Sequence, residues 1–95
     1  MTLNAAAIES LSRGIADRLY IQVANWHLYL GDAGLAAPLA RECAGRLDQG
    51  AAVCARQAVE ALQVPIGGGA TRLPLARLIP ASQLRDLEEI LEPYC

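Results

Sequence analysis

The chain contains no lysine, and its eight basic residues are all arginines. They are scattered along 95 residues without forming a basic run, and the formal net charge is −2. Nucleic-acid binding depends on many simultaneous phosphate contacts, so this pattern disfavours that class of protein. It also offers no basic face to a membrane surface. We therefore expect no nucleic-acid partner, and attachment to a membrane would need a partner protein.

Residues that commonly bind metals are few. The chain has one histidine, His27, and three cysteines, Cys43, Cys54 and Cys95. An odd number of cysteines without a CxxC pair indicates neither a disulfide framework nor a zinc site. We expect free thiols in a reducing compartment, with Cys95 exposed near the end of the chain. We also expect no metal site and no cofactor.

Catalytic motifs are missing too, since the sequence holds no GxSxG, Walker A or HExxH pattern. The triple glycine at residues 67–69 is contiguous and therefore differs from GxGxxG. A nucleophile pair of His27 with Cys43 or Cys54 is conceivable, but an inert buried cysteine is the simpler interpretation. We predict that the protein is not an enzyme.

No hydrophobic run is long enough to cross a membrane. The longest uncharged stretch after Arg18 covers residues 19–31 and is interrupted by Gln22, Asn25 and His27. It falls short of the roughly 20 apolar residues that a spanning helix needs. The first ten residues lack the basic and apolar regions of a signal peptide. We expect a cytoplasmic protein without direct membrane insertion.

Phenylalanine is absent and β-branched residues are few, while hydrophobic residues, many of them Ala and Leu, make up 54% of the chain. Such a composition favours helices. We predict one mostly α-helical domain over residues 1–95, a small bundle of about four helices. The first helix should be capped by Asn4 or Thr2 and end near Gly31. Apolar residues recur along it at helical spacing: Ile8, Leu11, Ile15, Leu19, Val23, Trp26 and Leu30.

The rest of the chain predicts shorter elements. Pro38 suits the first turn of a second helix, and Asp48 suits the cap of a third that runs to Leu62. One long helix across this region is the alternative. The sequences VPI and TRL flank Gly67, Gly68 and Gly69, so a short β-hairpin is possible there. A single helical turn at residues 75–79 and a last helix from Ser82 complete the prediction.

Aromatic residues make up only 4% of the chain, yet most of them lie between residues 20 and 29. On the predicted first helix, Trp26 falls on the core side. Beside it lies a second row of polar and aromatic side chains at steps of four, three and four residues, namely Arg18, Gln22, Asn25 and Tyr29. Such a mixture is typical of interface anchors, although a buried central helix would explain it equally. The predicted partner-binding residues are Arg18, Tyr20, Gln22, Asn25, His27 and Tyr29.

Several segments, spread over most of the chain, carry a resemblance to a known family: Asp17, Arg18, Tyr20, Val23, residues 26–33, the triple glycine and residues 90–94. Together they resemble a family of small cyanobacterial proteins that is known only as a domain of unknown function. The resemblance implies a cyanobacterial cytoplasmic or stromal-side protein. It favours an accessory role linked to photosynthesis, and it brings no activity and no catalytic residues.

The leading functional prediction is a non-enzymatic helical module for protein interaction or assembly, whose partner is another protein or a second copy. The alternative is a small-ligand or pigment-binding protein that uses the region of Trp26 and His27. A third hypothesis, an enzyme using the triple-glycine loop with Asp32 or His27, has the least support because the loop lacks a phosphate-binding motif.

Overall fold

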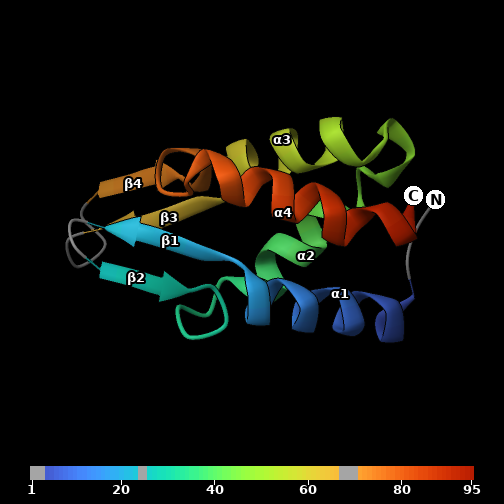
Figure 1. The fold of residues 1–95 in the computed structure, drawn as a ribbon, viewed down its shortest axis with the longest axis horizontal. Helices are drawn as coiled ribbons and strands as arrows, with labels where there is room; N and C mark the ends of the chain where they lie inside the picture. The colour runs from blue at the N-terminus through green and yellow to red at the C-terminus, as the bar shows by residue number, and fades with distance from the viewer. Residues whose placement is uncertain (1–3, 24–25, 67–70) are drawn as a thin grey trace.

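The computed structural model describes residues 4–23, 26–66 and 71–95 (Figure 1). Within these residues the chain forms four α-helices and two antiparallel β-hairpins, together with three single 3-10 turns. The predicted mostly helical fold is confirmed, as is a hairpin around the triple glycine; Gly67, Gly68 and Gly69 themselves lie outside the described residues. The elements are α1 (Ala5–Arg18), β1 (Tyr20–Val23), β2 (Trp26–Tyr29), α2 (Ala36–Ala44), α3 (Ala51–Ala61), β3 (Gln63–Ile66), β4 (Thr71–Pro74) and α4 (Ala81–Leu91).

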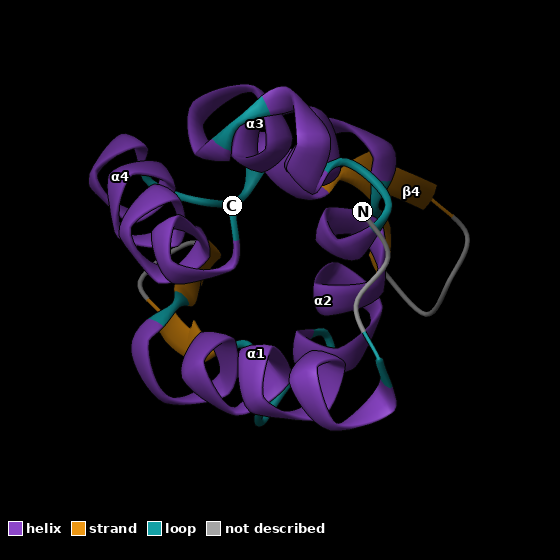
Figure 2. Ribbon diagram, turned by 90° about the vertical axis from the view of Figure 1, so that its right-hand side faces the viewer, coloured by secondary structure: helices purple, strands orange, loops and turns teal. Residues whose placement is uncertain are grey.

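The molecule has a helical end and a hairpin end. The helices gather at the end that carries both chain termini, and both hairpins extend from the opposite end (Figure 1). Viewed from the helical end, the four helices surround a common centre (Figure 2). Leucines fill this centre because α1 packs on α2 and α3 packs on α4. The fully buried leucines are Leu11, Leu19, Leu30, Leu39, Leu75, Leu87 and Leu91.

The predicted first helix is wrong beyond Arg18. Asn4 caps the helix as expected, because its Oδ1 accepts from the Ala7 amide at 2.8 Å. The helix then stops, and the chain from Tyr20 to Tyr29 folds into the β1–β2 hairpin, in which Ile21 pairs with Leu28. Aromatic and β-branched residues dominate these two strands and favour extended backbone. The polar row that ran through Arg18, Gln22, Asn25 and Tyr29 therefore does not exist as a helix face.

The middle of the chain forms two separate helices, as preferred from the sequence. The predicted cap at Asp48 is wrong, because Asp48 lies in a 3-10 turn (Leu47–Gln49). Gly50 precedes α3 instead, without a side-chain cap, and its φ of 93° is a conformation that favours glycine. The predicted helical turn after Pro74 is the 3-10 turn Leu75–Arg77, and the last helix begins one residue before Ser82.

Candidate functional site

The two hairpins enclose a shallow apolar groove. Its volume is about 470 Å³, and the residues around it come from β1, β2, the turn after β2, and β3. None of these side chains carries a charge or a hydrogen-bonding group. The lining residues are Ile21, Leu28, Ala33, Gly34, Leu35, Val64 and Pro65. A surface of this kind binds by apolar contact.

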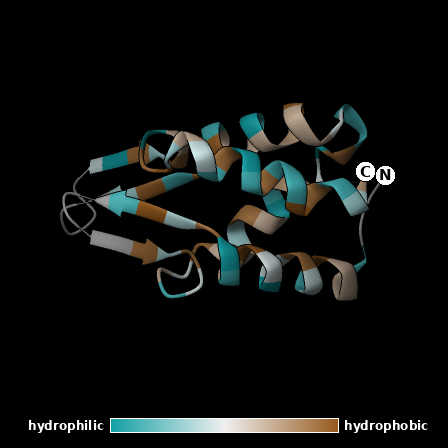
Figure 3. Ribbon diagram, in the orientation of Figure 1, coloured by the Kyte–Doolittle hydropathy of each residue, from teal (hydrophilic) through white to brown (hydrophobic). Residues whose placement is uncertain are grey.

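Exposed apolar surface is concentrated on strand β2. Leu28 is 41% exposed and Tyr29 is 48% exposed, and they are the large hydrophobic residues exposed among the residues that the structure describes. Leu28 also lines the groove. The Tyr29 ring meets the Tyr20 ring edge to face, with 6.0 Å between the ring centroids. Figure 3 shows hydrophobic segments on both strands of this hairpin. Successive side chains of a strand point to opposite faces, so Tyr29 lies on the face of the hairpin opposite Leu28 and the groove. We call the groove, Leu28 and Tyr29 together the hairpin surface.

Acidic residues are absent from the four strands of the two hairpins. The sequence contains no Asp or Glu between Asp17 and Asp32, and none between Glu60 and Asp86. All four strands fall inside these two segments, and Arg72 is the one charged residue among the strand residues. The acidic side chains therefore sit on the helices and turns. A nearly uncharged end has little charge to desolvate when it is covered by a partner.

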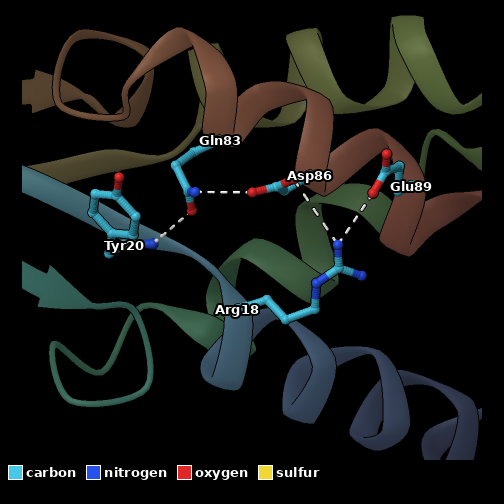
Figure 4. A network of polar contacts seen from close by, with 5 residues as sticks. All are labelled: Arg18, Tyr20, Gln83, Asp86 and Glu89. Carbon is cyan, nitrogen blue, oxygen red and sulfur yellow. Dashed lines mark hydrogen bonds and ion pairs between the residues drawn. The ribbon is translucent and has the colours of Figure 1, made fainter.

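A polar network attaches the hairpin to the bundle (Figure 4). The Tyr20 backbone N–H donates to Gln83 Oε1 at 3.1 Å, and Gln83 Nε2 donates to Asp86 Oδ2 at 2.9 Å. Below it, the Arg18 guanidinium lies 3.2 Å from Glu89 and 4.0 Å from Asp86. Strand β1 is thereby fixed against α4 where helix α1 ends.

The residues predicted as a partner-binding set do not form one row. Arg18 faces α4, Gln22 is exposed on β1, and Tyr20 is half-buried beside the exposed Tyr29. His27 belongs to β2, but its side chain and that of Trp26 lie outside the described part of the structure, as does all of Asn25.

Leu28 was not among the predicted site residues, because the predicted first helix did not place it in the polar and aromatic row. The signal that could have found it is its pairing with buried Ile21 across a hairpin.

The thiols are free, as predicted: Cys43 and Cys54 are buried and Cys95 is exposed. Burial raises the pKa of the Cys43 and Cys54 thiols. Over residues 4–23, 26–66 and 71–95 no three His, Cys, Asp or Glu side chains come together in a way that could hold a metal ion. Within the same ranges, no helix is long and apolar enough to span a membrane.

Comparison with known proteins places the chain in a family. Residues 8–94 match the family described as "Protein of unknown function (DUF3181)". The chain is also 34% identical over 98 aligned positions to the thylakoid-associated protein slr0729 of Synechocystis sp. (strain ATCC 27184 / PCC 6803 / Kazusa), with 99% of this chain and 95% of that protein covered. No solved structure matches significantly. The resemblance seen in the sequence is confirmed, and the chain belongs to the DUF3181 family of proteins of unknown function.

Proposed function

We propose that this protein is a non-enzymatic accessory module that binds another protein through the hairpin surface. The observation that carries the proposal is exposed Leu28 at the uncharged apolar groove, with exposed Tyr29 on the other face of the same strand. Aromatic and aliphatic anchors beside a pocket are the usual centre of a protein interface, because their burial releases water from apolar area. The absence of acidic residues from the four strands lowers the desolvation cost further.

The relative supports a proposal for the place of action. That protein is named as thylakoid-associated, and we propose a thylakoid context, linked to photosynthesis, for this chain too. Attachment would then run through a protein that already resides at the membrane. The hairpin surface would face that protein, and the acidic helical end would point away from it.

The test is a pull-down under mild conditions from a cyanobacterial host that carries the tagged protein. The variant changes Leu28→Gln and Tyr29→Gln together, since both side chains are exposed and the fold should tolerate the change. The matched control changes Glu9→Gln and Arg13→Gln together, which alters two exposed side chains of helix α1. We expect a stoichiometric partner that the variant loses and the control keeps. A partner retained by the variant would contradict the proposal.

A second candidate function is binding of a small apolar ligand or pigment. The groove volume of about 470 Å³ supports it, because small-molecule sites commonly range over about 300–1,000 Å³. The same purification decides this case, since a bound pigment gives a coloured protein and a mass increment in native mass spectrometry. A colourless protein with the bare chain mass would contradict it.

A further inference from the structure

Two of the three cysteines lie at the junction of α2 and α3. Cys43 lies in the last turn of α2, and Cys54 lies in the first turn of α3. The Cys54 Sγ donates to the Cys43 carbonyl oxygen at 3.2 Å. Both residues are fully buried, and both thiols are free in this structure. The Cys54 sulfur is therefore held against the backbone of Cys43 on the neighbouring helix.

We propose that Cys43 and Cys54 close into a disulfide when the folded protein meets a peroxide, and that this bond locks α2 to α3. The contact supplies part of what a disulfide requires, because it holds the sulfur of Cys54 against the backbone of Cys43 on a separate element. The proposal is independent of the hairpin surface, which lies at the other end of the fold.

The reaction balances with one peroxide for each disulfide. The Cys54 thiolate attacks one peroxide oxygen, an S–O bond forms, and the O–O bond breaks with departure of an alkoxide or hydroxide that takes up a proton. The Cys43 sulfur then attacks the Cys54 sulfur. The S–S bond forms, the S–O bond breaks, and the oxygen leaves as water with the proton of Cys43. Two thiols are oxidised and the peroxide is reduced to an alcohol, or water, plus water.

Cys54 is the better first nucleophile. Burial raises the pKa of both thiols, but the hydrogen bond from the Cys43 thiol lowers the pKa of Cys54 and so opposes part of that rise. Thiolate is the reactive form, so the remaining rise predicts a slow reaction that needs sustained oxidant. Such a pair responds to prolonged rather than brief peroxide exposure.

A groove at the C-terminal turn lies close to Cys54. A groove of about 360 Å³ is lined by Leu47, Asp48, Gly50, Tyr94 and Cys95. The Cys54 amide donates to the Gly50 carbonyl oxygen at 2.9 Å, so Cys54 is one helical turn away from this groove. A hydrogen bond of 3.0 Å from the Tyr94 hydroxyl to Ser10 holds the turn on α1. Opening of this turn would admit the oxidant.

The experiment treats the full chain carrying Cys95→Ser with hydrogen peroxide and measures the intact mass and a non-reducing digest. We expect a monomer that has lost two hydrogens, a peptide linking residues 43 and 54, and a higher midpoint of thermal unfolding that a reductant reverses. The control, Cys54→Ser in the same background, should show no such loss. The unaltered chain is run in parallel.

Three results would overturn the proposal. Both thiols could survive in the folded chain while the same treatment links them in denaturant. Cys54 could proceed to sulfinic acid without a crosslink. In the unaltered chain, Cys54 could join Cys95 instead of Cys43.

Discussion

At the scale of single residues, Gln83 connects distant parts of the chain. Among the residues that the structure describes, Gln83 is the one polar residue that is buried. Its amide oxygen accepts one hydrogen bond and its amide nitrogen donates another. Its partner on the hairpin, the Tyr20 amide, lies 63 positions away. A buried amide of this kind is stabilising only while its partners remain in place, because each lost partner leaves a polar group without a hydrogen bond.

Replacing Gln83→Leu should destabilise the fold by about 1–3 kcal/mol, since the Tyr20 N–H loses its acceptor in a partly buried position. Urea unfolding followed by circular dichroism measures the change in the free energy of unfolding. Gln22→Leu is the matched control. Gln22 is exposed on β1, the strand that also contains Tyr20, and its substitution should change the free energy of unfolding little. Equal effects of the two substitutions would show that the Gln83 contact contributes nothing.

At the scale of elements, the strands β1 and β2 decide the shape of the candidate site. Spacings of three and four through Leu19, Val23, Trp26 and Leu30 fit a helix, and those residues were therefore predicted as helical. The same segment also alternates, because Leu19 and Ile21 are buried whereas Gln22 is exposed. When a short segment fits both periods, its contacts with other parts of the chain decide whether it forms a helix or a strand. Here those contacts are made with Gln83 and with the Leu78 carbonyl oxygen, which accepts from the Gln22 amide at 3.0 Å.

The remaining helices follow from local signals, and these were predictable. Asn4 caps α1, Pro38 lies in the first turn of α2, and Pro80 precedes α4. The prediction of Asp48 as a helix cap failed because Gly50 occupies the position before α3. Gly50 can adopt the positive φ that the chain needs there, so Asp48, two residues earlier, lies in the 3-10 turn. The hairpin surface needed long-range pairing, so it was only partly predictable.

Two glycines, Gly31 in the turn after β2 and Gly45 at the end of α2, should respond differently to substitution by alanine. A Cβ added at Gly31 would lie 2.8 Å from the Cβ of Ala16 on α1, whereas one at Gly45 would meet nothing within 4 Å. Gly31→Ala should therefore destabilise the protein by about 1–3 kcal/mol through overpacking. Gly45→Ala, at an ordinary helical φ of −78°, should be neutral or slightly stabilising. Thermal unfolding of both variants measures this, and similar midpoints would contradict the close packing of the turn on α1.

At the scale of the whole molecule, the hairpin end exposes apolar side chains, while several outward backbone positions of its strands are already hydrogen-bonded or are prolines. Gln83 and Leu78 bind the outward amides of β1, and the Tyr29 carbonyl oxygen accepts from the Ala33 amide at 3.0 Å. Pro65 and Pro74 stand at strand positions that alternation turns outward, where they offer no N–H. The end is therefore suited to side-chain docking rather than to the addition of a strand.

The most direct test of the account is photo-crosslinking from single positions in the living host. A photoreactive phenylalanine analogue replaces Tyr29 in one strain and Tyr94 in another, and crosslinked products are identified by mass spectrometry. The account predicts one dominant protein crosslinked from position 29 and not from position 94. Crosslinks from position 94 alone, or equal crosslinks from both positions, would contradict the assignment of the hairpin surface as the binding surface.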